Sequence, residues 1–281
     1  MKVLVTGGGG MLGRDVGLAA RAVGHEPIVL TRAELDIGDR EAVEEACIEH
    51  YPGAVDNCAA WTNVDGAEEH FAEAKDVNGR GAGNVAAAAA AVGASVIYPS
   101  TDYVFDGKKE QGYVESDPVG PLSAYGMSKL AGERETAAAN ERHWIVRSSW
   151  LFGVNGRNFV ETMLSLAQDR EEVVVVRDQI GCPTYTGHLA AGLIRLLDGD
   201  DHGIHHMAGA GRCSWYDFAV EIFKLARLET RVLSMTSDML DRPAPRPPYS
   251  VLISEREHPV LLPDWHEGLA DYLAERAEVS A

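Results

Sequence analysis

The chain has 281 residues, enough for one large domain or for a domain with a smaller lobe, and 46% of them are hydrophobic, which excludes a disordered chain. Its formal net charge of −18 argues against nucleic acid and anionic membranes as partners, and no apolar run approaches the roughly 20 residues of a membrane span. Only six of the 25 basic residues are lysine, and such an acidic surface suits a salt-rich cytosol in which screening relieves self-repulsion. A strand-like run from Lys2 and four scattered cysteines indicate a cytoplasmic protein with reduced thiols.

Strands and helices alternate through the first half of the chain, beginning with a strand at 2–6. The pattern then predicts helix 11–24, strand 27–30, helix 40–50 with Asp39 or Asp36 as N-cap, strand 54–60, helix 72–92, strand 94–100, helix 123–140 and strand 143–153. This alternation is typical of a doubly wound parallel sheet. We therefore expect an α/β fold, with a Rossmann-type dinucleotide-binding domain over 1–153.

The regular alternation of strands and helices becomes less clear after Gly153. Apolar spacing predicts helix 159–168, strand 173–176, helix 189–197, strand 203–209, helix 214–227, an extended loop at 241–248 and helix 265–276. Helix 214–227 carries an apolar stripe that we assign to a core. Residues 154–281 are expected to form mainly a smaller substrate-binding lobe, with segments near 187–209 returning to the sheet.

A glycine-rich loop, VTGGGGMLG at 5–13, follows the first strand and opens the first helix. Two registers fit a dinucleotide fingerprint, one using Gly8, Gly10 and Gly13 and the other Gly7, Gly10 and Gly13. Either gives a tight turn, a close approach of backbone to pyrophosphate and a helix N-terminus that faces it. At the first βα turn of such a chain, the pattern indicates a bound dinucleotide.

The residues after the second strand bear on the choice between NADP and NAD. An acidic residue for the ribose is expected there, but the chain has Thr31-Arg32. Arg32 suits the 2′-phosphate of NADP, whereas Glu34 and Asp36 close by would serve NAD. We therefore expect NADPH as cofactor, with NADH as the alternative. The alternative role for Arg32 is that of a solvated loop charge.

Tyr125 and Lys129 stand four residues apart near the start of helix 123–140, so they share one face. An ammonium near a phenol favours the phenolate, and a bound oxidised nicotinamide adds positive charge. This pair suits carbonyl reduction, in which hydride reaches carbon and a proton reaches oxygen. The fourth strand leads to Thr101 and Asp102 at the edge where such sheets bind ligands, and Thr101 can hydrogen-bond a substrate carbonyl.

With these motifs, the sequence resembles the extended short-chain dehydrogenase/reductases, and within them the dTDP-4-dehydrorhamnose reductase family. The resemblance covers nearly the whole chain and rests on VTGGGGMLGRDV (5–16), LTRAELDIGD (30–39), NCAAWTNVDGAE (57–68), STDYVFDG (100–107), YGMSKLAGE (125–133), RSSWLFG (147–153) and QIGCPTYT (179–186). It implies reduction of the 4-keto group of dTDP-4-dehydro-6-deoxy-L-mannose, or a closely related nucleotide sugar, to give dTDP-L-rhamnose with NADPH or NADH.

The resemblance also implies roles for individual residues. The expected cofactor residues are Gly7, Gly10, Met11, Leu12, Gly13, Arg32, Asp36, Ile37, Ala59, Ala60, Trp61, Tyr125 and Lys129. The expected catalytic residues are Thr101, Tyr125 and Lys129, and the expected substrate residues are Thr101, Asp102, Tyr125 and Trp150. Core packing competes with sugar or base stacking for Trp150.

Some positions depart from the family pattern. Trp61 stands where tyrosine or histidine is usual. Tyr249 stands where asparagine is frequent, in a loop expected to face the sugar, and this change leaves the exact sugar open. Some members bind Mg²⁺ at a dimer contact, and Asp15 matches one ligand, but its partners are missing and no metal is predicted. We expect a monomer or a homodimer.

Further residues fit more than one role. Arg246, held by prolines, suits a diphosphate or is a solvated loop charge; Asn78 suits an active-site role or a capping one. His205 and His206 are adjacent on a strand and point to opposite faces, so they do not share a metal.

Two other functions remain open. One is an epimerase or dehydratase of the same fold, although Asp102 lacks the neighbouring carboxylate that a dehydratase needs. The other is a non-catalytic subunit related to the partner of methionine adenosyltransferase.

Overall fold

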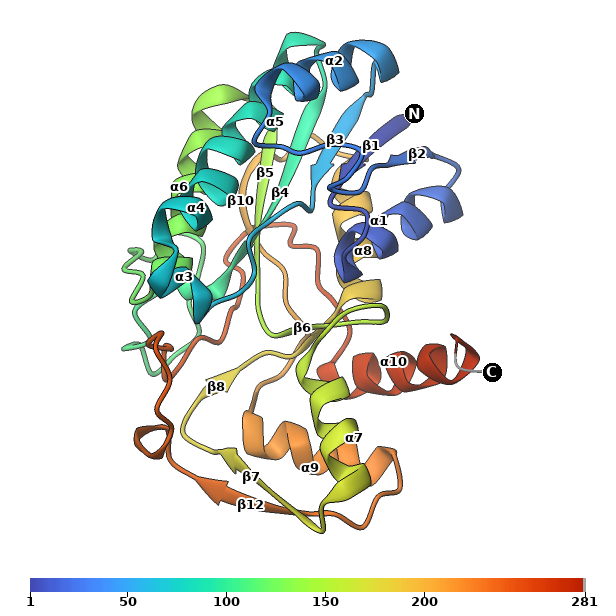
Figure 1. Cartoon of the computed structure of the whole chain (residues 1–281). Helices are drawn as coiled ribbons and strands as arrows, with labels where there is room; N and C mark the ends of the chain where they lie inside the picture. The colour runs from blue at the N-terminus through green and yellow to red at the C-terminus, as the bar shows by residue number, and fades with distance from the viewer. Residues whose placement is uncertain (280–281) are drawn as a thin grey trace.

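A six-stranded parallel sheet forms the centre of the computed structural model, which describes residues 1–279 (Figure 1). The strands lie in the order β10-β5-β4-β3-β1-β2. Their bounds are β1 Lys2–Thr6, β2 Glu26–Val29, β3 Ala54–Asn57, β4 Ser95–Thr101, β5 His143–Ser148 and β10 Gly203–His206. The predicted α/β fold class is therefore confirmed. The chain order reverses between β1 and β3, where such sheets bind their ligands.

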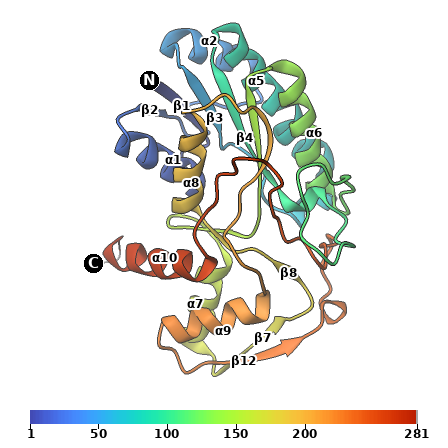
Figure 2. The same cartoon turned by 180° about the vertical axis from the view of Figure 1, so that it is seen from behind.

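Helices cover both faces of the sheet. On one face lie α1 Met11–Ala22 and α8 Thr186–Leu196, which pack against each other and on a core that includes Val3, Val5, Ile97 and Val146. The other face carries α2 Arg40–His50, α5 Ala82–Ala91 and α6 Ala124–Ala139 (Figures 1 and 2). Asp39 caps α2 as one of the two expected residues, since its side chain accepts a hydrogen bond from the Ala42 N–H at 3.2 Å.

The predicted helix 72–92 is not a regular α-helix. It consists of α4 Phe71–Lys75, the π-helix η1 Asp76–Gly81 and α5, and a short helix α3 Gly66–Glu69 precedes it. A close crossing with α6 accompanies the π-helix: a Cβ on Gly132 would lie 2.1 Å from the carbonyl oxygen of Asn78. π-helical turns of this kind occur often at functional sites.

The predicted strand 143–153 is also interrupted. β5 ends at Ser148, Trp150 has a φ of +50°, and β6 Leu151–Phe152 then pairs with β9 Thr184–Tyr185 outside the main sheet. The positive φ turns the chain away from the sheet and toward a second lobe. The prediction of one continuous strand was wrong because tertiary packing imposes this turn.

The second lobe is built around its own core (Figure 2). It contains α7 Phe159–Asp169, α9 Trp215–Leu225, α10 Trp265–Val279 and the strands β7 Glu172–Val176, β8 Ile180–Gly181, β11 Cys213–Ser214 and β12 Arg231–Met235. Two short 3₁₀ turns complete the elements: η2 Asp102–Val104 follows β4, and η3 Ser237–Met239 follows β12. Phe218, Ile222 and Phe223 of α9 are buried, which confirms the expected core stripe. The sequence analysis missed β12, which pairs with β7 in parallel.

The path of the chain crosses between the lobes. α8 and β10 belong to the first lobe although they follow residue 153, and β10 pairs with β5 from Gly203 to His206. The division of the chain at residue 153 stays a prediction. None of the helices formed by residues 1–279 combines the length and apolar character that crossing a membrane requires.

Candidate active site

The glycine loop lies between β1 and α1, at the carboxyl edge of the sheet. Gly7 has a φ of +67°, and a Cβ there would lie 2.6 Å from the backbone nitrogen of Ala59. A Cβ on Gly13 would lie 2.5 Å from the Gly7 carbonyl oxygen. Packing therefore requires these two glycines, and of the two registers the structure gives the left-handed turn to the one that begins at Gly7.

The loop leaves room for a ligand at its outer end. Gly10 is the N-cap residue of α1 and is exposed, and a Cβ there would meet nothing closer than the Gly7 carbonyl oxygen at 3.4 Å. Beside the loop, Nδ2 of Asn57 is buried without a hydrogen-bond partner within residues 1–279, while its Oδ1 accepts from Thr6. An open helix N-terminus next to an unsatisfied donor fits a dinucleotide pyrophosphate.

The expected adenosine-side residues lie after β2. Arg32 is 83% exposed, and its guanidinium lies 3.7 Å from the Asp36 carboxylate. Glu34 is turned back on its own loop, where its carboxylate accepts from the backbone N–H and the hydroxyl of Thr31, both at 2.8 Å. Arg32 thus extends into solvent with Asp36 beside it, whereas Ile37 is buried. This arrangement favours a 2′-phosphate over a second ribose hydroxyl.

The first turns of α6 carry the tyrosine and the lysine. Lys129 is 3% exposed, its Nζ donates to the carbonyl oxygen of Pro99 at 2.7 Å, and it lies 4.0 Å from the centre of the Tyr98 ring. Burial lowers the pKa of Lys129 to about 7, and the charges of Glu133 and Cys58 oppose that shift. Burial therefore makes the charged form of Lys129 unfavourable, and a bound anionic ligand would offset this desolvation cost.

Tyr125 is half-buried beside Lys129, with the ring of Tyr103 edge-on at 5.7 Å. Burial raises the pKa of its phenol, the carboxylate of Asp102 raises it further, and a hydrogen bond with Thr101 opposes both. The phenol therefore carries its proton at neutral pH. A protonated phenol can act as a general acid.

Thr101 ends β4 and Asp102 begins η2, and both are buried. The Thr101 hydroxyl donates to Oδ1 of Asp102 at 3.1 Å and accepts from the Tyr103 N–H at 3.2 Å. Burial raises the pKa of Asp102 to about 7, against hydrogen bonds from Ser250 and Thr101. The structure thus brings three of the predicted residues, Thr101, Asp102 and Tyr125, into one cluster.

Sequence reasoning missed a buried ion pair directly behind the lysine. Glu133 and Arg147 are 3% and 2% exposed, and the guanidinium donates to both carboxylate oxygens at 2.9 and 2.8 Å. The Ser100 hydroxyl donates to the same carboxylate at 2.6 Å. The signal was present, because Glu133 lies one turn after Lys129 in the quoted motif and therefore shares its helix face.

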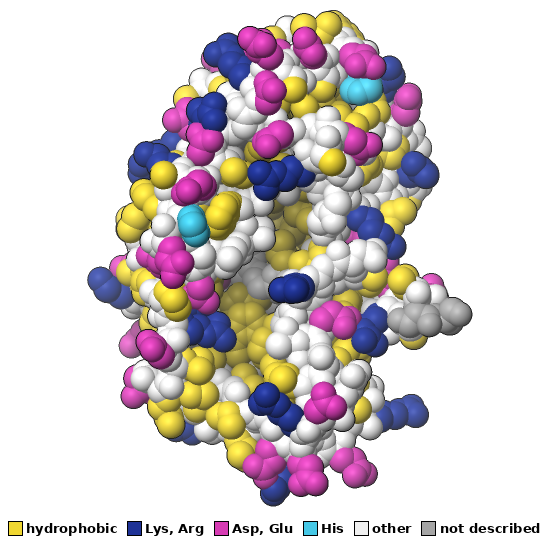
Figure 3. All heavy atoms as spheres, in the orientation of Figure 1, with side chains coloured by type: hydrophobic (Ala, Val, Ile, Leu, Met, Phe, Trp, Pro, Cys, Tyr) yellow, Lys and Arg dark blue, Asp and Glu magenta, His cyan; other side chains and the backbone are white. Residues whose placement is uncertain are grey.

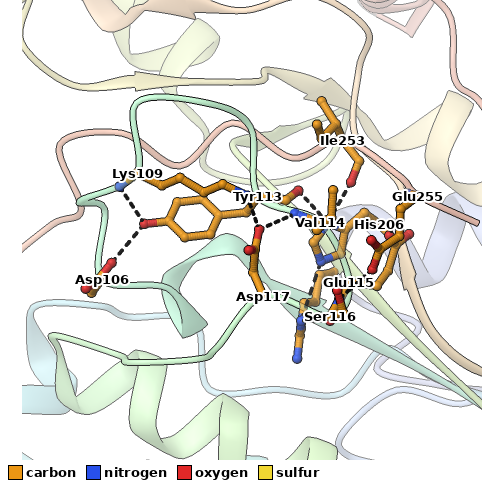
Figure 4. A network of polar contacts seen from close by, with 11 residues as sticks. Asp106, Lys109, Tyr113, Val114, Glu115, Ser116, Asp117, His206, Ile253 and Glu255 are labelled. Carbon is orange, nitrogen blue, oxygen red and sulfur yellow. Dashed lines mark hydrogen bonds and ion pairs between the residues drawn. The ribbon is translucent and has the colours of Figure 1, made fainter.

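The ion pair continues into the network of Figure 4, which links the loop at 106–117 to His206 and to the segment near Glu255. His206 Nδ1 lies 3.0 Å from the Tyr113 carbonyl oxygen and 2.9 Å from that of Ile253, and Arg147 approaches its Nε2 at 3.5 Å. Burial lowers the pKa of His206, so the ring is neutral. His205 instead contacts the carbonyl oxygen of Asp201.

Asn78 takes a positioning role within the π-helix. Its Oδ1 accepts from the Trp61 N–H at 2.8 Å, and its Nδ2 donates to the Trp61 carbonyl oxygen at 3.0 Å and to the Ser128 hydroxyl at 2.9 Å. One buried amide thus joins the segment Ala59–Ala60–Trp61 to α6, next to Lys129. This segment follows β3, and its Ala59 lies against Gly7 of the glycine loop; its place along the cofactor stays a prediction.

A cleft of about 680 Å³ opens in the second lobe, with Tyr103 of the first lobe on its border, and Figure 3 shows a hollow with hydrophobic walls in this region. Tyr103, Phe159, Trp215, Gln179 and Arg246 line it, among others. Trp150 lies behind this wall: its ring stacks on Trp215, with centres 3.6 Å apart, and packs against the second core. Of the two expected roles of Trp150, core packing thus accounts for much of its position. Arg246 is not a solvated loop charge, because it is 11% exposed and paired with Asp65.

Comparisons with known proteins agree with this geometry. A family model described as the RmlD substrate-binding domain matches residues 1–278. The spore coat polysaccharide biosynthesis protein SpsK of Bacillus subtilis is 42% identical over 278 residues, which cover 98% of each chain. A dTDP-4-dehydrorhamnose reductase structure from Clostridium acetobutylicum is 42% identical, with a TM-score of 0.95 and coverage of 99% of this chain and 100% of that one.

A second solved structure bears on the cofactor. The dTDP-4-dehydrorhamnose reductase of Bacillus anthracis in complex with NADP is 37% identical, with a TM-score of 0.94 and coverage of 98% and 99%. Matches of this extent and identity, together with the glycine loop and the Tyr125–Lys129 pair, place the chain in a family. The chain belongs to the RmlD family, the dTDP-4-dehydrorhamnose reductases of the extended short-chain dehydrogenase/reductase fold.

Proposed function

We propose that the protein is an NADPH-dependent reductase of the 4-keto group of dTDP-4-dehydro-6-deoxy-L-mannose, giving dTDP-L-rhamnose. The observation that carries this proposal is the cluster of Thr101, Tyr125 and Lys129 at the carboxyl edge of β4, where Tyr125 packs against Tyr103, a residue that lines the cleft. The 37%-identical relative solved with NADP supports the choice of cofactor.

The residues present fit the dinucleotide. Gly7, Gly10, Met11, Leu12 and Gly13 form the loop and helix N-terminus that would hold its pyrophosphate, with the unsatisfied Nδ2 of Asn57 beside them. Arg32 would hold the 2′-phosphate, and Asp36 and Ile37 would flank the adenosine. The segment Ala59, Ala60 and Trp61 would run along the middle of the cofactor, and Lys129 would bind the nicotinamide ribose.

NADPH, when bound, supplies the hydride for the carbonyl carbon. Tyr125 donates its proton to the carbonyl oxygen, since burial keeps the phenol protonated at neutral pH. Lys129 then stabilises the phenolate that remains, because an opposite charge one helical turn away favours the ionised form. For Thr101 to hydrogen-bond the substrate carbonyl, its hydroxyl proton must turn away from Asp102.

The second lobe provides the nucleotide-sugar site. Asp102 and Tyr125 of the first lobe would face the sugar, and Arg246 lines the cleft where the diphosphate would pass. Trp215 forms part of the wall of this cleft, and Trp150 stacks on it from behind. The protein is proposed to act in the cytoplasm, as a monomer or a homodimer.

The test is oxidation of NADPH on addition of the keto sugar, generated in situ with its epimerase, followed by identification of dTDP-L-rhamnose. Tyr125→Phe should keep the wild-type dissociation constant for NADPH and lose turnover by at least about 100-fold. Near-wild-type turnover in that variant would remove the tyrosine from the mechanism. An absence of turnover in the wild type, with NADPH still bound, would contradict the proposed substrate.

A further inference from the structure

Asp65 and Arg246 lie 181 residues apart in the chain and join the two lobes. Asp65 immediately precedes α3, four residues after Trp61 in the segment expected to follow the cofactor. Arg246 belongs to the proline-rich segment 242–248, which we call the strap, between η3 and the residues that return to the first lobe. The strap borders the cleft, since Arg242, Ala244, Pro245 and Arg246 all line it.

The contact between the two residues is a fixed, two-pronged one. Nη1 of Arg246 donates to Oδ1 of Asp65 at 3.0 Å, and Nη2 donates to Oδ2 at 2.8 Å. The Ala244 N–H donates to Oδ1 at 3.2 Å, and Nη1 also donates to the Ala244 carbonyl oxygen at 2.6 Å. These four hydrogen bonds among the strap and the carboxylate define one orientation of the guanidinium.

This pair differs from an ordinary surface ion pair. The Arg246 side chain is 11% exposed and that of Asp65 39%, and the hydrogen bond from Arg246 is the main reason why the pKa of Asp65 lies below its usual value. Exposed pairs contribute about 0–1 kcal/mol because water screens them and two long side chains must be ordered. Here backbone and side chain are ordered together, so the carboxylate fixes a segment as well as a charge.

The orientation leaves one edge of the guanidinium for a ligand. Asp65 takes the edge formed by Nη1 and Nη2, and Ala244 takes the second proton of Nη1. Nε and the second proton of Nη2 have no acceptor among residues 1–279. These two parallel N–H groups form the other edge of the fork, which matches two oxygens of a phosphoryl group.

The remainder of the strap is held just as closely. Gly107 has a φ of +72°, and a Cβ there would lie 2.6 Å from Pro248 Cδ. Tyr249 forms a β-bridge with Ile180 directly after the strap. With Asp65 at one end and these contacts at the other, the backbone of the strap has little freedom to re-aim Arg246.

We propose that Asp65 is a positioning residue for the nucleotide diphosphate: it holds the strap across the cleft and aims the Nε–Nη2 edge of Arg246 at the substrate. This inference rests on the proposed function and assigns Asp65 no contact with the substrate. Because Asp65 belongs to the segment that follows Trp61, it also ties the diphosphate site to the cofactor side of the cleft.

The experiment compares wild type with Asp65→Asn in two assays. In Asp65→Asn the amide turns an NH₂ group toward one Nη, so the two-pronged contact is lost. We expect the Kd for dTDP, by calorimetry, and the KM for the keto sugar to rise about tenfold or more. The kcat should stay within about threefold, and the Kd for NADPH should not change. Asp65→Glu should recover part of the affinity.

Two further variants separate positioning from general destabilisation. Arg246→Lys keeps the charge and loses the fork, and Asp65→Asn should add little to its effect on the dTDP Kd, because both remove the same contact. Glu172→Gln breaks the exposed pair with Arg231 in the same lobe and should leave both assays unchanged. All variants are checked for the wild-type Tm.

The outcomes separate this inference from the proposed function. Wild-type turnover tests the function, whereas the ratio of the variant and wild-type Kd for dTDP tests Asp65. If the wild type binds dTDP but does not reduce the keto sugar, the proposed substrate is wrong. The ratio of the dTDP Kd of Asp65→Asn to that of the wild type still decides the role of Asp65. An Asp65→Asn variant with the wild-type dTDP Kd, fully additive effects with Arg246→Lys, or a wild type that does not bind dTDP would overturn the inference.

Discussion

Replacing Glu133 with glutamine is the sharpest test of the structure's energetics. The substitution keeps the size of the side chain and removes its charge, so the buried guanidinium of Arg147 loses its counter-ion. Both residues are less than 5% exposed, and the pair also receives the Ser100 hydroxyl. Water cannot replace the lost charge at such a depth.

The expected loss follows from the burial of the pair. Removing one member of a buried ion pair costs about 3–5 kcal/mol, because the other charge stays buried without compensation. For a chain of this size, that loss lowers the Tm by roughly 6–10 °C. The double variant Glu133→Gln/Arg147→Met removes both charges, and we expect it to be more stable than Glu133→Gln alone.

Urea unfolding and calorimetry of Glu133→Gln, Arg147→Met and the double variant provide the measurement. Glu44→Gln is the matched control, since its pair with Arg40 has side chains that are 42% and 70% exposed, and it should change stability by less than about 0.5 kcal/mol. A loss below about 1 kcal/mol in Glu133→Gln, or a double variant whose loss equals the sum of the singles, would refute the reasoning.

Three other predictions concern the glycine loop, the lysine and the surface charge. Gly10→Ala should keep the wild-type Tm and weaken NADPH binding at least about tenfold. Gly13→Ala should lower the Tm, because its Cβ would lie 2.5 Å from the Gly7 carbonyl oxygen. Fluorescence titration measures the NADPH affinity and calorimetry the Tm, and equal Tm losses in the two variants would contradict the distinction. Burial lowers the pKa of Lys129 from 10.5 to about 7, so between these pH values the unfolded chain binds more protons than the folded one. The free energy of unfolding of the wild type, relative to that of Lys129→Met, should therefore rise as the pH increases from about 7 to about 10.5. If this difference in unfolding free energy does not change with pH, the lysine is not desolvated. With a net charge of −18, the Tm and the activity should both rise between low salt and molar KCl, and a fall in either would contradict a surface adapted to high salt.

The sequence predicted the sheet domain well because its signals are local. Apolar runs, glycines after the first strand and a tyrosine one helical turn before a lysine each involve neighbours within a few residues. The structure brings Thr101 and Tyr125 together at the edge of β4, as expected. Whether the residues of this cluster perform their assigned roles stays a prediction.

The features that escaped prediction depend on contacts distant in sequence. The π-helix around Asn78 accompanies a close crossing with Gly132, and no local pattern encodes the depth of that crossing. The turn at Trp150 places a bulky residue at positive φ, which local preference opposes and stacking on Trp215 accompanies. Arg246 was recognised as a candidate, but Asp65, its partner from the other lobe, was not.

The late return of the chain to the first sheet has a consequence for engineering. β10 covers the edge of β5 from Gly203 to His206, and α8 lies against α1, so both lobes share one continuous piece of chain. A fragment cut at residue 153 would present an uncovered strand edge, which invites self-association. New sugar specificities are therefore better sought by exchanging loops at the cleft than by grafting the substrate lobe of one relative onto the nucleotide domain of another.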